Sequence, residues 1–512
     1  MRSYSRNPRA ASSVAPLIPI AQHGVPFTSG SGQAFVRLRV STEGFVILAV
    51  RSQAYRDWFF AQYYAAHDAL PSSHAFRTIL HHLEAQANND SDNRRLSVFR
   101  RVGSRGQGFI PDQILLDLAN SEGQFVEISP DGWRVTAGTN ALLQTSLSAR
   151  ELPAPLHGPE DAPPDPAATL ETLRACLNLS SRADWLRCLA WLLAALRPTG
   201  PFPILILQGP PGSGKTSAAR LLRFLIDPST APFTPFPHNT RHLLSLARHN
   251  WVLAFDHIGK LSPQLGDALC RLSTGVGVLV PETPLPDPTR DPLLKHLSRP
   301  MIFTVTDKWS PAPDFAGRAL AVTLPEIPNT NRRADTDLLT TYSDAYPHLL
   351  GALCSAVATA LQRVSAVRFS EATRQAGAQA WAMAAAPALG CTEAEMQQAF
   401  TGPTAHPLVQ SIEALLIPQG LWTGTAADLL PHLAPSTEYQ TPKGLSQHLK
   451  TAAPRLASAG IQLAFSRSRR GDRIIELRRN PFDASSGIDP QDASKTTVAD
   501  PQPTESKDLK AA

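Results

Sequence analysis

The stretch that most limits how this chain can fold is Gly209-Pro-Pro-Gly-Ser-Gly-Lys-Thr216. It follows the apolar run Ile204-Leu-Ile-Leu207 and precedes a segment of helical periodicity over about residues 215–226. Glycines at these spacings let backbone N–H groups turn inward at the start of a helix, where they surround an anion. A buried strand, a glycine-rich loop and a helix in this order therefore predict a phosphate-binding loop (P-loop) in an α/β domain.

The residue types in this loop suit a nucleoside triphosphate with Mg²⁺. Lys215 would reach the β- and γ-phosphates of ATP, and the Thr216 hydroxyl would ligate the metal. A chance glycine-rich turn is the alternative, but the flanking strand and helix favour nucleotide binding. A lipase-type nucleophile at Ser213 is excluded because the GxSxG spacing is absent. The residues expected to bind ATP are Gly209, Pro210, Pro211, Gly212, Ser213, Gly214, Lys215, Thr216 and Ser217.

A second apolar run, Trp251-Val-Leu-Ala-Phe-Asp256, ends in the carboxylate that such a loop requires. We expect Asp256 to hold Mg²⁺ together with Thr216, the alternative being an aspartate that caps the next element. The following residue is His257, where many ATPases of this kind place Glu to polarise the attacking water. Hydrolysis is then slow, or another group orients the water, or ATP is bound without turnover. His257 is itself a candidate base near neutral pH.

Composition bounds the class of protein. A chain of 512 residues with 43% hydrophobic residues suits about three domains, and 46 prolines predict proline-rich connections between them. The net charge of +5 is compatible with nucleic acid but does not require it. The five cysteines form no CxxC pair, so neither a zinc site nor a disulfide framework is indicated. They stand at positions 176, 188, 270, 354 and 391.

The sequence predicts a cytoplasmic protein with no membrane association. Its basic N-terminus lacks the long apolar stretch of a secretory signal, because Pro16 and Pro19 interrupt it. The longest apolar run, residues 185–196, contains Arg187 and is too short to span a bilayer. Isolated cysteines in apolar surroundings are typical of a reducing compartment.

Changes in composition divide the chain. Alternating apolar residues from Ala34 and from Gly44 predict strands, six prolines crowd residues 153–166, and helical periodicity dominates residues 338–400. The N-terminal module carries no primase-like set of metal-binding carboxylates. The expected divisions are a disordered segment 1–31, an α+β accessory domain 32–150, a proline-rich linker 151–168, a P-loop ATPase core 169–330, a helical lid 331–402, a winged-helix domain 403–480 and a disordered tail 481–512.

The winged-helix prediction rests on the order of the C-terminal elements. A helix starts near Thr425, a second covers about residues 444–456, and two strands follow from Ile461 and Arg473. Arginines crowd the connection between these strands, which suits contact with DNA phosphates. A solvated face or a protein-binding winged helix is the alternative. The residues expected to bind DNA are Lys443, Lys450, Arg467, Arg469, Arg470 and Arg473.

Three further segments, residues 250–257, 267–275 and 314–320, resemble the ATPase module of primase-helicases carried by phages, plasmids and integrated elements. That family is related to superfamily 3 and AAA+ ATPases. The resemblance covers residues 169–480 well and residues 34–150 more loosely. It implies an oligomeric ring, expected to be a hexamer, with ATP at subunit interfaces and DNA as partner. The missing primase would be a separate protein.

The resemblance also implies roles for individual residues. Arg318 aligns with an arginine finger that reaches the neighbour's γ-phosphate, the alternative being an ion-paired surface arginine. Thr304 aligns with a polar sensor that is usually Asn. The family's DNA-gripping hairpin corresponds to residues 278–295, where prolines argue against regular strand pairing. These prolines are Pro281, Pro284, Pro286, Pro288 and Pro292.

Together these patterns predict an AAA+/superfamily 3-like, DNA-associated ATPase of a mobile genetic element that acts in DNA replication by loading on or unwinding DNA. Two alternatives stay open. One is a nucleotide-gated assembly or regulatory protein with slow or absent hydrolysis. The other is an AAA+ ATPase that remodels proteins.

Overall fold

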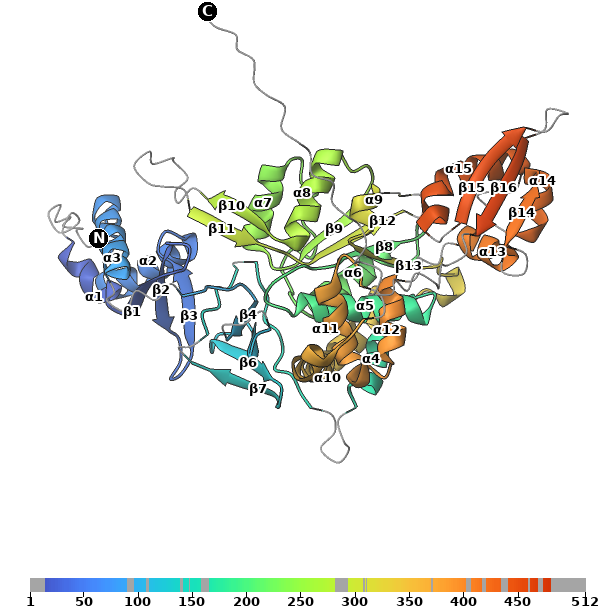
Figure 1. Cartoon of the computed structure of the whole chain (residues 1–512). Helices are drawn as coiled ribbons and strands as arrows, with labels where there is room; N and C mark the ends of the chain where they lie inside the picture. Colours follow the sequence, from blue (N-terminus) through green and yellow to red (C-terminus); the bar gives the residue numbers. More distant parts are fainter. Residues whose placement is uncertain are drawn as a thin grey trace, which may run out of the picture. The chain divides into compact units, whose positions relative to one another are not determined.

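The computed structural model divides the chain into two compact units, Met1–Thr404 and Ala405–Ala512, and each is described by itself. Figure 1 labels most of the helices and strands in both units. The residues that the structure describes are 14–89, 96–106, 110–138, 141–146, 148–157, 165–280, 293–306, 309, 311–369, 372–401, 407–416, 420–433, 441–458, 461–467 and 473–479.

The first unit begins with a three-stranded antiparallel sheet in the order β1-β2-β3. The strands predicted from Ala34 and Gly44 are confirmed as β2 and β3. The expectation of disorder over residues 1–31 differs from the structure over 14–31, because Leu17 and Phe27 are buried in apolar clusters and hold this segment. The elements are η2 (Ala15–Leu17), α1 (Ile18–Ala21), β1 (Gly24–Thr28), β2 (Ala34–Arg39), β3 (Phe45–Ala49), α2 (Gln53–His67) and α3 (Ser73–Asn88).

A four-stranded antiparallel sheet, β4-β5-β6-β7, follows. Strands β6 and β7 form a hairpin, since Ser129 pairs with Gly132 across a two-residue connection. The expected linker is anchored in its described part, because Leu152 N donates to Leu118 O at 2.9 Å and Leu156 N to Pro347 O at 3.0 Å. The strands are β4 (Val102–Arg105), β5 (Gln113–Asp117), β6 (Gln124–Ser129) and β7 (Gly132–Ala137).

The centre of the first unit is a parallel sheet in the order β13-β8-β12-β9. Its strands are almost entirely apolar, as expected for a sheet that is covered by helices on both faces. The predicted α/β core is therefore confirmed. The strands are β8 (Ile204–Gln208), β9 (Leu253–Ile258), β12 (Met301–Val305) and β13 (Ala319–Thr323), and the helices are α4 (Pro166–Ala175), α5 (Arg182–Ala195), α6 (Lys215–Phe224), α7 (Thr240–His249), α8 (Pro263–Thr274) and α9 (Pro313–Ala316).

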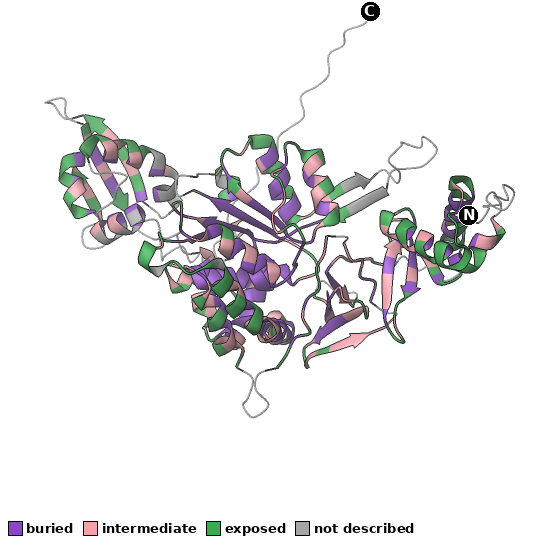
Figure 2. Cartoon of the chain, turned by 180° about the vertical axis from the view of Figure 1, so that it is seen from behind, coloured by how far each residue is buried: buried purple, intermediate pink, exposed green. Residues whose placement is uncertain are grey.

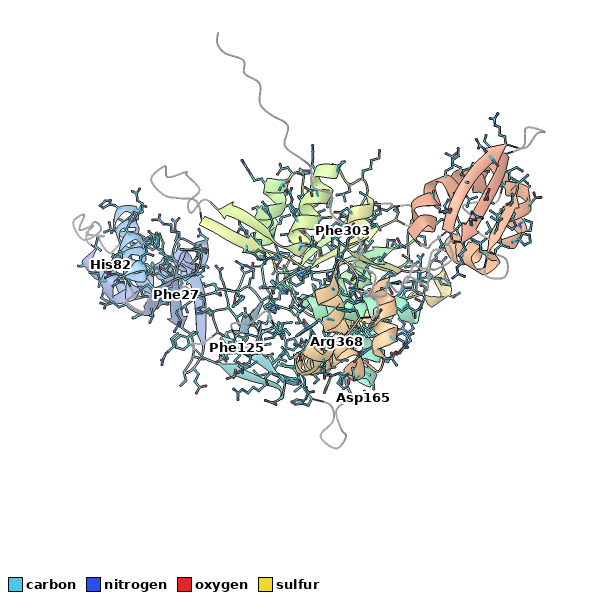
Figure 3. The ribbon with its side chains drawn as sticks, viewed as in Figure 1. Phe27, His82, Phe125, Asp165, Phe303 and Arg368 are labelled. Atoms are coloured by element: carbon cyan, nitrogen blue, oxygen red, sulfur yellow. The ribbon has the colours of Figure 1, made fainter. Side chains whose placement is uncertain are left out.

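Two apolar clusters sandwich this sheet. Leu205 and Leu207 of β8 face a large cluster that includes α5 and α6. Ile204 and Ile206, which alternate with them, face a cluster built with α7 and α8. Phe303 of β12, labelled in Figure 3, belongs to this second cluster. Figure 2 shows the continuous burial of the sheet between its helical layers.

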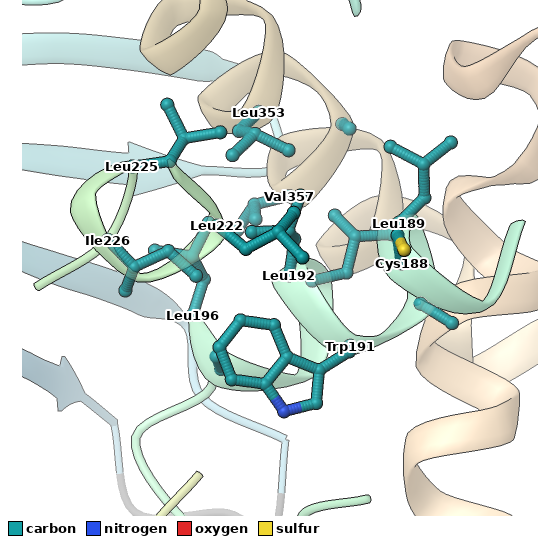
Figure 4. Packing of buried hydrophobic residues seen from close by; sticks show 14 of the residues in the cluster. Cys188, Leu189, Trp191, Leu192, Leu196, Leu222, Leu225, Ile226, Leu353 and Val357 are labelled. Atoms are coloured by element: carbon teal, nitrogen blue, oxygen red, sulfur yellow. The ribbon is translucent and has the colours of Figure 1, made fainter. Parts of the chain in front are cut away.

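The expected helical lid is not a separate module, because its helices share the large cluster with α5 and α6. Figure 4 shows Leu353 and Val357 of α10 packed near Leu192 of α5 and Leu222 of α6. The boundary expected at residues 330–331 therefore divides one continuous core. The elements are η3 (Asn329–Asn331), α10 (Asp335–Arg363), η4 (Val364–Ala366), α11 (Ala376–Ala385), η5 (Ala386–Leu389) and α12 (Glu393–Thr401).

One described helical stretch, Thr336–Ala366, is long and apolar enough to cross a membrane by length and composition alone. Of its most apolar window, 61% is buried inside the protein, as for the core helix of a globular domain. The test therefore gives only weak evidence for a membrane span.

A hairpin lies between α8 and β12, where the resemblance placed a DNA-gripping element. Strands β10 (Val276–Val280) and β11 (Leu293–Leu297) pair antiparallel from Val276↔Leu297 to Val280↔Leu293. The expectation that prolines prevent regular pairing was wrong for these strands. All five prolines fall within residues 281–292, outside the described residues, so the paired strands keep their backbone donors.

The second unit has the element order helix, strand, helix, helix, strand, strand. Its sheet has the antiparallel order β14-β16-β15 and packs against the helices through one apolar cluster. The helix start predicted near Thr425 is confirmed, since Thr425 and Asp428 bond reciprocally in a capping box at the start of α14. The elements are α13 (Pro407–Leu416), β14 (Leu421–Gly424), α14 (Ala426–Leu429), η6 (Leu430–His432), α15 (Pro442–Ser458), β15 (Ile461–Arg467) and β16 (Arg473–Arg479).

Candidate functional site

The glycine-rich loop joins the carboxyl end of β8 to the start of α6. Gly212 and Gly214 adopt φ values of 78° and 82°, which a side chain would strain. A Cβ atom on Gly209 would lie 2.3 Å from Leu324 O, so only glycine fits there. The loop is therefore held in one conformation by backbone geometry and by the segment that follows β13.

Lys215 is buried at the base of this loop, with 8% of its surface exposed. Its Nζ donates to Gly209 O at 2.9 Å, to Pro210 O at 2.7 Å and to Ser213 Oγ at 3.2 Å. A buried ammonium group requires polar partners, and here the loop supplies them. The positive charge is consequently fixed against the loop that was predicted to bind phosphate.

Thr216 and Asp256 meet beside the loop. Thr216 Oγ1 lies 3.1 Å from Asp256 Oδ1 and 3.2 Å from Oδ2. A hydroxyl and a carboxylate are hard oxygen ligands, which Mg²⁺ prefers. These two residues fit the predicted metal role. Asp256 lies near the carboxyl end of β9, and Thr216 lies in the first turn of α6, which begins at the same edge of the sheet.

Thr304 of the neighbouring strand β12 is fully buried and orients this carboxylate. Its hydroxyl donates to Asp256 Oδ1 and accepts from the backbone N–H of His257 at 2.8 Å. The register between β9 and β12 shifts between Phe303 and Val305, at this contact. The residue predicted as a sensor therefore lies next to Asp256.

His257 has the backbone of a strained position, with φ at 55°. Its ring is 80% exposed, and Nε2 lies 3.5 Å from Asp256 Oδ2. The left-handed turn directs the Asp256 carboxylate towards Thr216 and leaves the imidazole at the edge of the site. A ring nitrogen at this edge can accept a proton from a water molecule.

The remaining predicted residues of the loop differ in exposure. Pro211 and Gly212 are exposed at its tip, Ser213 is buried, and Ser217 is half-buried in the first turn of α6. Ser213 therefore contributes to the internal structure of the loop as well as to the bonds of Lys215.

Arg318 lies at the opposite end of the sheet. Ala319 pairs with Ile204 and Thr323 with Gln208, so Arg318 is five residues from the loop end, roughly 16 Å at 3.3 Å per residue. Its Nε is 3.5 Å from Asp314 Oδ2 and makes no hydrogen bond. Arg374 also binds Asp314 and is the main cause that lowers the pKa of that carboxyl. Arg318 cannot reach the loop of its own chain.

Asn178 was not identified from the sequence. It stands in the turn between α4 and α5, and its Nδ2 donates to Ser213 O at 3.1 Å and to Pro325 O at 2.6 Å. The side chain thus ties the loop to the segment after β13. A lone Asn in a polar turn carries no sequence signal for such a contact.

The second unit carries the predicted basic residues on α15 and on the β15–β16 hairpin. Lys443 and Lys450 are seven residues apart, two helical turns, and both are exposed. Arg467 and Arg473 are also exposed and stand directly opposite each other in the register. Arg469 and Arg470 lie outside the described residues.

The register shows that these hairpin arginines share a face with the helix. Phe465 pairs with Ile475 on the side that packs against α15, and Arg467–Arg473 is the next pair on the same face. Lys450 Nζ lies 5.9 Å from the centre of the Phe465 ring. Lys450, Arg467 and Arg473 therefore form one basic face of the second unit, named the basic face below.

Two family models match the sequence. The actinomycete integrative conjugative element replication protein model matches residues 170–392, and the RepA C-terminal domain model of the same elements matches residues 407–491. Together the two ranges make up more than half of the chain. The chain belongs to this family of replication proteins. The gap between the two matched regions contains the boundary between the structural units at residues 404–405.

Solved structures show weaker similarity. The C-terminal region of NrS-1 matches with 7% identity and a TM-score of 0.34, over 90% of this chain and 98% of that chain. The X-ray structure of JCV helicase matches with 13% identity and a TM-score of 0.22, over 45% of this chain and 74% of that chain. A search of curated proteins gave no match. Both TM-scores are below 0.5.

Proposed function

We propose that this replication protein binds ATP with Mg²⁺, hydrolyses it, and uses the energy to load on or unwind DNA of an integrative conjugative element. One observation carries the proposal. Lys215 and Thr216 of the glycine-rich loop meet Asp256, which lies 40 residues beyond Thr216 in the sequence, at the carboxyl edge of the parallel sheet. This is the arrangement that cradles a phosphate chain at a helix N-terminus.

Each residue then has a defined task. The Lys215 ammonium exchanges its loop carbonyl partners for phosphate oxygens, which are stronger acceptors because they are charged. Thr216 and Asp256 would hold Mg²⁺, which neutralises phosphate charge when it is bound. Thr304 keeps the carboxylate in place, and His257 is the group positioned to orient water.

Assembly follows from the position of Arg318. Because its guanidinium is remote from the loop of its own chain, it can act only in the site of a neighbouring subunit. We therefore propose an oligomeric ring, with six subunits as the implied number.

The second unit supports a DNA partner. Its order of helices and strands is that of a winged helix, in which α15 would be the recognition helix and β15–β16 the wing. Like charges directly opposite on paired strands are destabilising, so Arg467 and Arg473 favour a bound anion. DNA phosphates supply such anions. A separate primase and a cytoplasmic location complete the proposal.

The first test is ATP hydrolysis by the purified protein with no DNA, with single-stranded DNA and with double-stranded DNA. DNA-stimulated turnover that Lys215→Ala abolishes would support the motor. Lys260→Ala, which removes an exposed lysine close to β9, is the matched control and should leave turnover unchanged. If the intact protein shows no salt-sensitive binding to DNA, the proposed DNA-dependent function is wrong.

A second candidate is a nucleotide-gated assembly protein, which the residue after Asp256 favours. His257 is largely exposed and stands where many related ATPases have Glu. In this case ATP should change the sedimentation of the protein without turnover. His257→Glu should then raise turnover, and a wild-type rate that depends on Arg318 would count against this candidate.

A further inference from the structure

The segment after β13 lies along the glycine-rich loop. We call residues 324–332 the strap. Cβ atoms built on three glycines of the loop would each meet a different strap residue: Leu324 O at 2.3 Å from Gly209, Arg332 Nη2 at 2.9 Å from Gly212, and Ile327 Cδ1 at 3.3 Å from Gly214. Different residues of the strap therefore lie close to the loop at its first glycine, at its exposed tip and at its last glycine.

The strap is held in this position at its start. Leu324 N donates to Gln208 O at 2.9 Å, which extends the pairing of β13 with β8 by one residue. Asn178 then links Pro325 O to Ser213 O through a single side-chain nitrogen. These bonds connect the strap both to the strand before the loop and to the loop itself.

Arg332 brings a second cation to the loop. Its guanidinium lies against Gly212 at the exposed tip, while Lys215 is buried at the base. Within the described part of the chain, no carboxylate forms an ion pair with Arg332. Two cations on one loop repel each other unless an anion lies between them.

We propose that Arg332 binds the phosphates of the nucleotide in its own subunit, as a second cationic ligand beside Lys215. A guanidinium presents N–H donors in a planar fork that matches phosphate oxygens bidentately. This inference rests on the proposed binding of ATP. It differs from the role of Arg318, since Arg332 lies on the loop of its own chain and Arg318 does not.

The binding also connects nucleotide to the helical layer. Arg332 stands three residues before α10, whose packing with α5 and α6 forms the large core. A phosphate held by Arg332 would therefore fix the start of α10 relative to the loop.

The test is titration of the full-length protein with fluorescent mant-ATP and mant-ADP. Arg332→Ala should weaken mant-ATP binding about tenfold or more, because it removes a charge-assisted pair. Arg332→Lys should retain part of the affinity, since the charge stays and the fork is lost. Arg333→Ala removes the adjacent exposed arginine and should leave the affinity unchanged. Thermal melting without nucleotide verifies that each variant is folded.

Two outcomes would overturn different claims. Wild-type affinity in Arg332→Ala, with binding lost in Lys215→Ala, would overturn this inference and leave the proposed function intact. No nucleotide binding by the wild-type protein would overturn the proposed function and the inference with it. Mixing Arg332→Ala with Lys215→Ala subunits should not restore tight binding, and restoration would place Arg332 in a neighbour's site instead.

Discussion

The Thr304 hydroxyl is used twice, as a donor to Asp256 and as an acceptor from His257 N–H. Both partners belong to the turn that ends β9. Because the hydroxyl is buried, water cannot take its place without a cavity. One side chain therefore sets the position of the carboxylate and of the imidazole that follows it.

Thr304→Ala should lower the rate of ATP hydrolysis by about tenfold or more while nucleotide affinity changes little, because Asp256 loses its positioning partner. It should also destabilise the protein by about 1–3 kcal/mol, since a backbone N–H loses its acceptor. Steady-state kinetics and urea denaturation measure the two effects. Thr304→Ser keeps the hydroxyl and should behave like the wild type. An unchanged rate in Thr304→Ala would refute the positioning role.

A buried ion pair joins the antiparallel sheet β4–β7 to the parallel sheet. Arg101 Nε lies 3.0 Å from Asp227 Oδ1, and its other nitrogens donate to Asp117 O at 2.9 Å and Arg150 O at 3.1 Å. Asp227 Oδ2 accepts from Val252 N at 3.0 Å, directly before β9. Burial raises the pKa of the nearby Asp117 carboxyl, and the Arg101 charge opposes this shift.

Arg101→Ala should destabilise the first unit by about 3–5 kcal/mol, because the buried Asp227 carboxylate loses its ion-pair partner. Chemical denaturation followed by circular dichroism measures the change. The control is Arg134→Ala, whose ion pair with Glu127 involves a 73% exposed arginine and should contribute at most about 1 kcal/mol. Equal effects of the two variants would contradict the structural account.

The periodicity of apolar residues predicts that helices form but does not predict where each helix ends. The helical pattern over residues 55–88 forms two helices because Asp68 takes a left-handed backbone and Ser72 caps α3. Likewise, the pattern over residues 170–196 forms α4 and α5, which leaves Asn178 in the turn between them. Pro71 and the N-cap serines Ser72 and Ser181 are the local signals of these breaks, and periodicity of apolar residues alone does not register them.

The proposed DNA contact of the basic face, formed by the β15–β16 hairpin and α15, can be tested by charge reversal. Arg467→Glu with Arg473→Glu should weaken DNA binding and lower the slope of log affinity against log salt by about two, one for each phosphate contact. ATP binding should stay at the wild-type level. Fluorescence anisotropy with labelled duplex DNA at several salt concentrations measures both quantities.

The matched control reverses one charge on the other face of the same hairpin. Arg478 is exposed and alternates with the core residues Ile475 and Leu477, so it points away from the basic face. Arg478→Glu should change DNA affinity less than either single reversal on the basic face. If all three charge reversals lowered DNA affinity equally, the net charge of the second unit would explain DNA binding better than a specific contact at the basic face. No effect of any reversal would favour a protein-remodelling role.

In the whole molecule, the two cations Lys215 and Arg318 stand at opposite ends of one sheet. The parallel register separates them by the length of β8 and β13. A site that uses both must therefore combine two subunits. This geometry connects the proposed chemistry to the proposed ring.

Mixing two inactive variants tests this arrangement. Lys215→Ala and Arg318→Ala should each abolish most ATP hydrolysis alone. In mixed assemblies some interfaces carry an intact Lys215 from one subunit and an intact Arg318 from its neighbour, so part of the activity should return. ATP hydrolysis measured across mixing ratios checks this result. If the mixtures hydrolyse ATP no faster than the sum of the residual rates of the two variants measured alone, Arg318 does not act in the site of a neighbouring subunit.

The sequence alone determined the features whose cause is local. The glycine spacing, the apolar run before Asp256 and the arginine-rich hairpin identify the loop, the carboxylate and the basic residues, because each pattern reflects backbone or charge requirements of neighbouring residues. The α/β class follows from the same alternation of strands and helices.

Only the tertiary structure decided which distant residues meet. The order of the strands places Thr304 beside Asp256. The register between β13 and β8 places Arg318 at the end of the sheet opposite the loop. The segment after β13 turns back and brings Arg332 close to Gly212. The lid helices likewise join the core through packing that their own periodicity does not specify. The physical reason is that strand order and packing depend on the burial of the whole chain, and no single segment encodes it.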